Sequence, residues 1–294
     1  MAEPATPART HGLVCIGNLT VDESIQPDGR RTEALGGDAV FAVLAARLAG
    51  GDATWLAPLG NDLPTGMAAA LRGAGLSLDQ PRRDRPTVRN VIHYDADGGR
   101  RWEMQCSEDD FDCLSVYPGD VRPDVLGARA LVLLAMSLGA QLALTPWLRA
   151  HSGAQLYLDL QEDYVTGNER ELAEIVAVCD VFLPSEVEAT RLARTGDLET
   201  AARRFAASGP RVVVIKRAGR GCLVLDAGRF TEVPAEVTTA VDPTGAGDAF
   251  CGAFAAAHLA TGDAVSAART ASRVAALAIG APGVTALLAA GTSP

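Results

Sequence analysis

Short apolar runs alternate with amphipathic segments along most of this 294-residue chain. Leu13–Gly17 is typical of a buried strand ending in glycine, and residues 36–50 then carry apolar side chains at helical spacing. We predict further strands at 53–59, 131–136, 156–160, 181–183 and 212–215, with helices at 67–72 and 169–178. This alternation predicts an α/β fold, a three-layer sandwich with a mostly parallel central sheet and helices on both faces.

One segment interrupts the alternation. Thr87–Met104 contains two extended stretches joined by a turn signal at 95–99, which predicts a β-hairpin. Together with the polar excursion at 20–34, the segment 86–106 can form a small β-sheet lid, or the hairpin can extend the edge of the main sheet. No internal repeat or low-complexity linker divides the chain, so we expect one domain over 1–294, which begins with a disordered arm, Met1–Arg9.

The chain is acidic, and its composition limits the partners it can bind. Its net charge is −10, and Lys216 is the only lysine among 26 basic residues, so no basic stripe favours nucleic acid. Positive potential for a polyanionic ligand must therefore come from backbone N–H groups, a helix end, a metal ion or a few arginines.

The cysteines and the apolar runs indicate a protein of the cytoplasm. The six cysteines form no CxxC pair, and several lie in apolar runs, which favours buried free thiols. The start of the chain lacks the pattern of a secretory signal, and the most apolar stretch, 130–144, is interrupted by polar residues. We expect no membrane partner.

A glycine-rich segment carries the strongest chemical signal. Val237–Val241 is predicted as a strand, followed by Asp242-Pro243-Thr244-Gly245-Ala246-Gly247-Asp248 and a helix of small residues at 249–259. Because Gly245 and Gly247 lack a Cβ, the backbone can approach a phosphate and direct several N–H groups at it, aided by the helix dipole.

Asp248 has two interpretations. It can be a helix N-cap or a carboxylate stabilised by the helix dipole, or it can accept a proton from a substrate hydroxyl that attacks the γ-phosphorus. We expect the helix N-terminus to lower the pKa of this carboxyl group.

Other nucleotide-binding loops fit poorly. The pattern GxxxxGK[ST] is absent, because Lys216 follows Ile215 rather than glycine, and this excludes a P-loop enzyme. Gly219-Arg220-Gly221 leads into an apparent strand at 222–225, whereas a dinucleotide turn must open a helix. A helix after Gly221 would revive an NAD-dependent enzyme.

Residues 242–250 resemble the C-terminal signature of the PfkB, or ribokinase-like, kinases. The two glycines, the alanine between them and the final Asp-Ala-Phe all match. The resemblance implies a ribokinase-like fold, Asp248 as catalytic base, and Gly245, Ala246 and Gly247 as an anion hole. It also implies that Asp242 and Thr244 help hold a monovalent cation such as K⁺, with Thr244 on the nucleotide side.

The N-terminal part of the chain agrees with this resemblance, which spans roughly residues 12–284. Asn18 and Asp22 match the family's first strand and its hydroxyl-binding acid, and Gly36-Gly37 matches its N-terminal signature. The resemblance implies that these residues bind substrate, together with Asp38. From the residues alone, Asp22 fits an Asx turn equally well, Gly36-Gly37 fits a helix-entry turn, and Asp38 fits a helix cap.

Phe41 departs from the family pattern, which usually has an asparagine four residues after the second glycine. Phenylalanine cannot bind a sugar hydroxyl. It either belongs to the apolar stripe with Leu44, Ala45 and Leu48, or it forms an aromatic wall at the edge of the substrate site, and we favour the edge.

Residues 183–188 resemble the family's Asn-x-x-Glu element, with Ser185 in place of asparagine and Glu188 retained. The resemblance implies that Glu188 organises Mg²⁺ through water and that Ser185 lies near the nucleotide. A helix capping box formed by the same two residues fits as well.

Residues 214–221 resemble the strand and turn along which the family binds ATP, with Ala218 in place of the usual first glycine. The resemblance makes Lys216, Gly219 and Gly221 nucleotide contacts. A lone lysine at a strand end can equally be a solvated charge.

We therefore expect an ATP-dependent kinase that uses Mg²⁺ and phosphorylates a hydroxyl group, with sugars as the first acceptor class and nucleosides as the second. A nucleotide-binding relative without catalysis is the alternative. By analogy of fold, an exposed lid can pair with a second copy to form a homodimer.

Overall fold

The computed structural model describes residues 12–95 and 100–291 of the chain. The N-terminal arm Met1–Arg9 and residues 96–99 of the expected hairpin turn lie outside the described residues.

The main sheet has eight strands in the order β12-β11-β10-β9-β8-β7-β1-β4 within the described part of the chain. Strands β4, β1, β7, β8, β9 and β10 are mutually parallel, and β11 and β12 add an antiparallel edge. The mostly parallel α/β fold is therefore confirmed. The strands are β1 Leu13–Ile16, β4 Ala53–Leu56, β7 Ala130–Leu133, β8 Gln155–Leu158, β9 Val181–Phe182, β10 Val212–Lys216, β11 Cys222–Asp226 and β12 Arg229–Val233.

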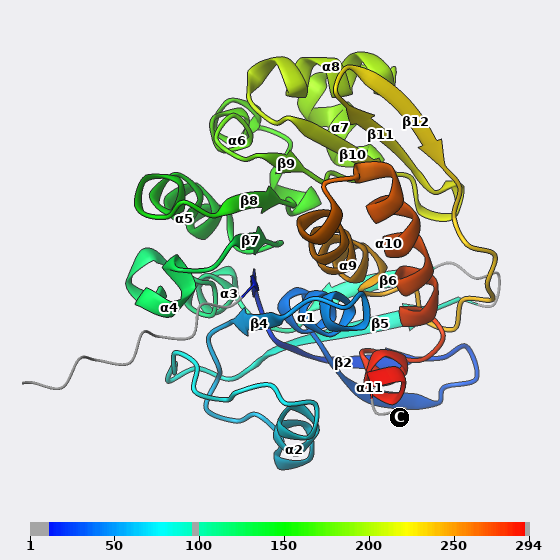
Figure 1. Ribbon diagram of the computed structural model, residues 1–294. Coiled ribbons are helices and arrows are strands. Elements are labelled where there is room, and N and C mark those ends of the chain that lie inside the picture. The colour runs from blue at the N-terminus through cyan, green and yellow to red at the C-terminus, as the bar shows by residue number, and fades with distance from the viewer. Residues whose placement is uncertain (1–11, 96–99, 292–294) are drawn as a thin grey trace, which may run out of the picture.

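Helices cover both faces of this sheet (Figure 1). Because side chains alternate along each strand, Cys15 and Trp55 join one hydrophobic cluster and Val14 and Leu56 join the other. The first cluster includes α1 Asp38–Leu48, α2 Thr65–Gly73, α9 Ala246–Thr261, α10 Ala264–Ala278 and α11 Thr285–Gly291. The second includes α4 Pro123–Leu126, α5 Leu138–His151, α6 Glu169–Val176, α7 Glu186–Ala193 and α8 Leu198–Ser208.

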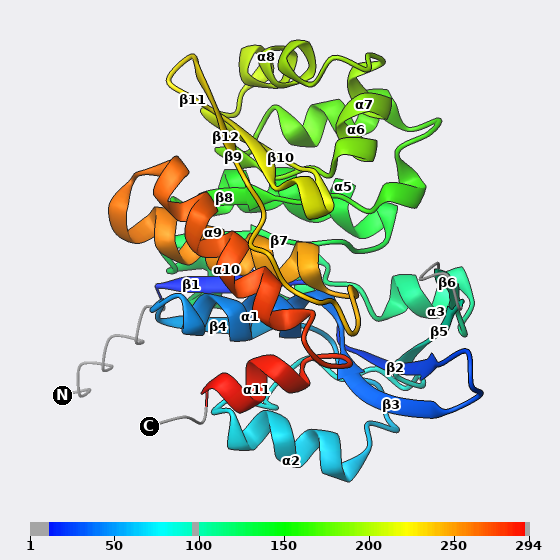
Figure 2. The ribbon, with the colours of Figure 1, turned by 90° about the vertical axis from the view of Figure 1, so that its right-hand side faces the viewer.

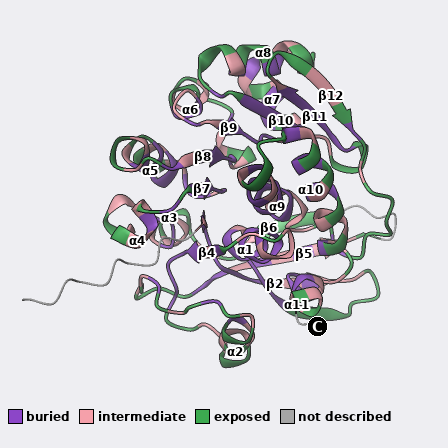
Figure 3. Cartoon of the chain, in the orientation of Figure 1, coloured by how far each residue is buried: buried purple, intermediate pink, exposed green. Residues whose placement is uncertain are grey.

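Helices α1 and α9 lie at the centre and are buried along most of their length (Figure 3). They approach so closely that a Cβ on Gly252 of α9 would overlap the carbonyl oxygen of Ala42 in α1. This close packing explains the small residues of α9 and fixes the position of its N-terminus relative to α1.

A second sheet, the lid, has the strand order β3-β2-β5-β6 and stands apart from the main sheet (Figure 2). Strands β2 and β5 are parallel, whereas β2–β3 and β5–β6 are antiparallel. The predicted lid is confirmed, and the alternative of an added edge hairpin is wrong. The strands are β2 Thr20–Ile25, β3 Arg31–Gly36, β5 Val88–Tyr94 and β6 Arg100–Met104.

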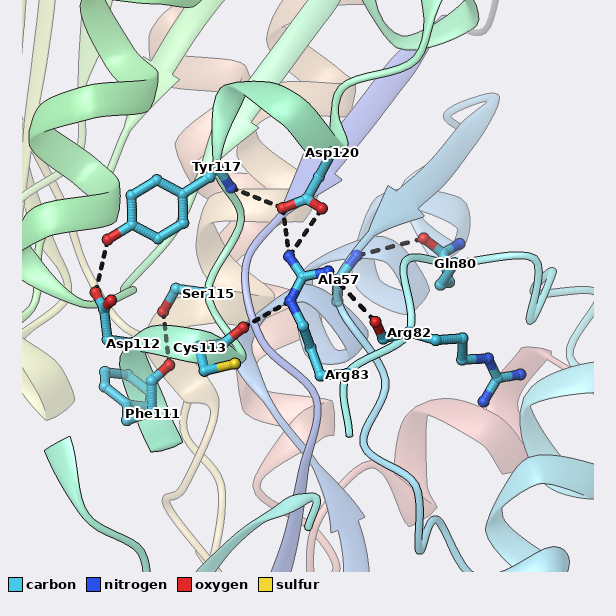
Figure 4. Close-up of polar contacts among 10 residues, drawn as sticks. All are labelled: Ala57, Gln80, Arg82, Arg83, Phe111, Asp112, Cys113, Ser115, Tyr117 and Asp120. Carbon is cyan, nitrogen blue, oxygen red and sulfur yellow. Dashed lines mark hydrogen bonds and ion pairs between the residues drawn. The ribbon is translucent and has the colours of Figure 1, made fainter. Parts of the chain in front are cut away.

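A polar network joins the chain segment before β5 to the segment after β6 (Figure 4). Arg83, before β5, donates to the carbonyl of Cys113 at 2.8 Å and to both carboxylate oxygens of Asp120 at 2.8 and 2.7 Å. Cys113 ends helix α3, Glu108–Cys113, which follows β6. The network therefore anchors the base of the lid hairpin.

The prediction of a strand at Val237–Val241 is wrong. The segment has no strand neighbour among the described residues, and the N–H groups of Val241 and Asp242 both donate to the carbonyl of Ile279 at the end of α10. The Val237 side chain is fully exposed. β-Branched residues favour extended backbone, but a strand also needs a neighbouring strand, and this segment bonds the end of α10 instead.

Two smaller expectations were also tested. All six cysteines are free thiols, four of them buried and Cys106 and Cys113 half-buried. Among the described helices, none combines the length and the apolar character needed to cross a membrane.

Candidate active site

Ligand-binding residues gather at the carboxyl ends of the parallel strands. Strand β1 lies between β4 and β7, so the order in which strands are added to the sheet reverses at β1. Open α/β sheets bind ligands at such a switch point. Asn18 follows β1, Asp159 follows β8 and Lys216 ends β10. The N-termini of α1 and α9 belong to the same region.

The glycine loop, residues 242–248, turns into α9 at Gly245. Gly245 has φ of 75°, a left-handed conformation that favours glycine, and α9 begins at Ala246. A Cβ on Gly245 would overlap the Phe41 ring, which is 1% exposed and part of the core. Phe41 therefore supports the loop from below, which favours its interpretation as a core residue over that of a wall at the substrate edge.

Asp248 lies in the first turn of α9 and is half-buried. Burial, and then the nearby Asp159 carboxylate, raise the pKa of Asp248 to about 6, although Lys216 and the backbone act in the opposite direction. The expectation of a lowered pKa is wrong, because desolvation outweighs the helix N-terminus. A carboxyl group with this pKa is ionised at neutral pH and is a stronger base than an exposed aspartate.

Lys216 lies behind the first turn of α9 rather than in solvent. Its Nζ donates to Asp159 Oδ2 at 2.5 Å and contacts Cys251 Sγ at 3.4 Å, and a Cβ on Gly247 would lie 3.7 Å from it. Although burial opposes the charge, the neighbouring Asp159 carboxylate raises the pKa of Lys216 above its ordinary value. The ammonium group therefore adds positive charge beside the glycine loop.

Glu188 and Ser185 form the expected capping box at the start of α7. Ser185 Oγ accepts from the Glu188 N–H at 3.2 Å, and Glu188 Oε2 accepts from the Ser185 N–H at 2.7 Å. Burial, and then Asp159, raise the pKa of Glu188 to about 8. Among the described residues no three such side chains come together to hold a metal ion, so Mg²⁺ at Glu188 would need water and the ATP phosphates as further ligands.

The lid contributes a buried polar cluster. Asp22, on β2, accepts from the Thr20 hydroxyl and from the Asn90 amide, both at 2.8 Å. Burial raises its pKa to about 6. A Cβ on Gly36 would overlap the Asp22 carboxylate, so this glycine lets the acid lie against the backbone. Asp22 is thus a strand residue rather than an Asx turn.

The side chain of Asn18, two residues before Thr20 in the chain, is buried. Within the described part of the chain, its side-chain nitrogen and oxygen have no hydrogen-bond partner, and neither has Asn90 Oδ1. Asp38 Oδ1 accepts from the N–H groups of Asn18 and Ala39, both at 2.5 Å. A Cβ on Gly37, which has φ of 98°, would overlap the backbone of Asn18. Buried polar atoms without partners suit a polar ligand or an ordered water.

Asp242 is surrounded by donors. Its Oδ1 accepts from the Tyr94 hydroxyl at 2.5 Å and from the Thr244 N–H at 2.9 Å, while Oδ2 accepts from the Gly283 N–H at 3.4 Å. The role of Asp242 and Thr244 in holding a monovalent cation stays a prediction. Tyr94 joins the lid directly to the glycine loop through its bond to Asp242.

The turn after β10 has an unusual backbone. Ala218, in place of the family's glycine, adopts φ of 49°, a left-handed conformation. Gly221 has φ of 83°, and a Cβ there would overlap Val233. The chain then enters β11 rather than a helix, so the interpretation as a dinucleotide-binding turn is wrong. A Cβ on Gly219 meets only open space.

Sequence reasoning missed three residues of this site: Asn90, Tyr94 and Asp159. Asp159 could have been found as the one carboxylate near the carboxyl end of the predicted strand at 156–160. Asn90 and Tyr94 occupy alternate positions of the hairpin, which place them on one face, but the sequence does not tell which face turns inward.

Comparisons with known proteins agree with this geometry. The sequence matches the pfkB family carbohydrate kinases over residues 11–290. A cytidine kinase from Thermococcus kodakarensis is 30% identical over 257 residues, 84% of this chain and 88% of that protein.

Solved structures share the fold. An adenosine kinase from Sinorhizobium meliloti has a TM-score of 0.81 at 20% identity, covering 96% of this chain and 98% of its own. A putative ribokinase II from E. coli, in complex with ATP and Mg²⁺, has a TM-score of 0.80 at 21% identity and covers 96% of both chains. This chain is therefore a phosphotransferase with an alcohol group as acceptor, and it belongs to the pfkB family of carbohydrate kinases.

Proposed function

We propose that the protein is an ATP-dependent nucleoside kinase that transfers the γ-phosphate to a hydroxyl group on the ribose of its substrate. The observation that carries this proposal is the pair of buried asparagines, Asn18 and Asn90, whose side chains have polar atoms without partners, and of these Asn90 also donates to Asp22. A ribose ring offers several hydroxyls, each of which both donates and accepts, and it would satisfy these atoms.

The cytidine kinase relative moves nucleosides ahead of simple sugars, because its identity extends over most of both chains. A free pentose is the second candidate, and the same polar cluster supports it, since the asparagines and Asp22 would contact only the sugar. The two candidates differ in whether a base lies beside the ring.

Asp248 accepts the proton of the attacking hydroxyl in this proposal. Its pKa of about 6 keeps it ionised at neutral pH, yet gives it more basicity than an exposed aspartate has. The first turn of α9 leaves N–H groups without partners inside the helix, and those of Gly245 and Gly247 stabilise charge on the moving phosphoryl group. The N–H of Ala246, the third group of the expected anion hole, already donates to the Pro243 carbonyl at 3.4 Å and would have to exchange this long bond for one to the phosphate. The ammonium group of Lys216, which lies near Cys251 and Gly247, adds positive potential to these N–H groups.

ATP would extend along the turn 216–221 towards the glycine loop, past Ser185 and Thr244. Glu188 would hold Mg²⁺ through water, and the ion would neutralise the ATP phosphates. Binding of the ion would favour ionised Glu188, whose pKa of about 8 leaves it mostly protonated at neutral pH in the structure as it stands.

A phosphorylation screen tests the proposal. Purified enzyme with ATP and Mg²⁺ is offered cytidine, adenosine, inosine, ribose and deoxyribose, and ADP release is measured together with the mass of the product. We expect a ribonucleoside to give the highest kcat/KM. The proposal of a nucleoside kinase fails if only free sugars are phosphorylated.

An Asn18→Ala variant tests the role of the polar cluster. Removing the unpaired amide should raise the KM for the acceptor, while the KM for ATP stays unchanged. Asn61→Ala is the matched control, since the Asn61 amide is exposed and bonds Asp84 away from the cluster.

A further inference from the structure

Trp102 is the one aromatic residue among the large apolar side chains that the described residues expose to solvent; its exposed fraction is 45%. The other exposed residues of this kind are the aliphatic Val187, Val237, Val241 and Leu277. Trp102 lies on β6 of the lid, a short strand that has β5 as its only neighbour among the described strands. A single exposed apolar side chain needs no ligand to explain it, so the case for a ligand depends on where the indole lies.

The strand register fixes the face on which Trp102 lies. Trp102 is directly opposite Ile92, and paired residues on neighbouring strands share one face. Ile92 is two positions from Asn90, whose amide bonds Asp22, and two positions from Tyr94, whose hydroxyl bonds Asp242. Trp102 therefore shares the lid face that is turned towards the glycine loop.

Three residues of this face lie on three neighbouring strands. Asp22 lies on β2, Asn90 on β5 and Trp102 on β6, so the indole is one strand beyond the polar cluster. Asn90 pairs with Met104, which makes Trp102 its diagonal neighbour, about 7–8 Å away between Cα atoms. A ligand whose polar ring reaches Asn90 can place a second, flat ring against the indole.

Resting on the proposed function, we propose that Trp102 is the stacking platform for the base of the nucleoside, while Asp22, Asn18 and Asn90 hold its ribose. An indole face recognises any base through its π-surface, so this contact selects nucleosides over free sugars more strongly than it selects one base over another. Ile92 is only 1% exposed, so Trp102 is the residue of this cross-strand pair that a base can reach.

The experiment compares the wild type with Trp102→Ala and Trp102→Phe, measuring KM and kcat for cytidine, adenosine, free ribose and ATP. We expect Trp102→Ala to raise the KM of both nucleosides about tenfold or more, since stacking contributes strongly per base. The KM values for ATP and for ribose should not change. Trp102→Phe should restore most of the affinity, because phenylalanine also stacks.

Trp147→Phe is the matched control. Trp147 lies on α5, stacks on His151 and belongs to the opposite face of the main sheet. Addition of cytidine without ATP should quench tryptophan fluorescence in the wild type and in Trp147→Phe, but not in Trp102→Phe. This binding signal does not depend on turnover.

The outcomes separate this inference from the proposed function. If the wild type phosphorylates nucleosides and Trp102→Ala leaves their KM and the quenching unchanged, the stacking role is overturned and the nucleoside kinase stands. An equal rise in KM for ribose would also overturn it, since it would show a general lid effect. If the wild type phosphorylates no nucleoside, both proposals fail.

Discussion

The electrostatic state of single residues determines the chemistry proposed for this site. Asp248 carries a pKa of about 6 because burial and Asp159 outweigh the opposing effect of Lys216 and the backbone. Only the ionised carboxylate can accept the proton of the attacking hydroxyl. The raised pKa therefore sets the lower pH limit of activity.

We predict that kcat/KM for the acceptor is constant above pH 7 and falls about tenfold per pH unit below about pH 6, because protonation removes the base. The measurement is kcat/KM from pH 4.5 to 8.5, since this ratio reports the pKa values of the free enzyme. Lys216→Met should move the acidic limb to higher pH, since Lys216 lowers the pKa of Asp248, whereas titration of ATP itself would leave the limb in place. A flat profile down to pH 4.5 would contradict this assignment.

Ala218 gives a residue-scale prediction about stability. Its φ of 49° is strained for a residue with a Cβ. Ala218→Gly should raise the free energy of unfolding by about 0.5–1 kcal/mol, the relief of strain less the greater backbone entropy of glycine. Urea denaturation measures the change. Ala206→Gly within α8 is the control and should lower stability by about 1 kcal/mol, so equal signs in the two variants would refute the argument.

At the scale of elements, the lid depends on its anchor and on its contact with the glycine loop. The Arg83 network joins the chain before β5 to the helix after β6, with Arg83 and Asp120 side chains only 23% and 10% exposed. Such a pair contributes more than an exposed one, because water competes less for its groups.

Arg83→Met keeps the apolar stem and removes the donors, so we expect the free energy of unfolding to fall by about 1–3 kcal/mol. Arg101→Met is the matched control, because Arg101 is 64% exposed and pairs with the half-exposed Glu103. Its effect should stay within about 0.5 kcal/mol. Thermal and urea unfolding of both variants test the difference, and equal losses would refute the anchor.

Tyr94 links the lid to the glycine loop through its bond to Asp242. Tyr94→Phe should lower kcat/KM for the acceptor about tenfold, because the loop loses its connection to the lid. Tyr164→Phe removes a comparable hydroxyl–carboxylate bond, at 2.7 Å to Glu108, and should leave kcat/KM unchanged. An unchanged kcat/KM in Tyr94→Phe would contradict the role of this link.

At the scale of the whole molecule, the parallel sheet brings residues distant in sequence to one edge. Alternating apolar segments predicted this sheet, and residues 87–104 predicted the lid hairpin, because both patterns follow from burial on one or two faces. The glycine loop predicted α9. The strand at Val237–Val241 was predicted wrongly, since propensity does not reveal whether a sheet edge is available.

The site was predictable only in part. Asp22, Gly36 and Asp248 carry local signals, whereas Asn90 and Trp102 acquire meaning only from the lid register. The sign of the Asp248 pKa shift also depended on burial by distant segments, which no local pattern contains.

The central claim is that the N-terminus of α9, with Asp248 as base, performs phosphoryl transfer. Asp248→Asn keeps the shape of the side chain and removes its basicity. Turnover should fall about 10²–10⁴-fold while calorimetry gives an unchanged Kd for ATP. Asp263→Asn, at the N-terminus of α10, is the matched control and should retain full turnover. Near-normal turnover of Asp248→Asn would contradict the account.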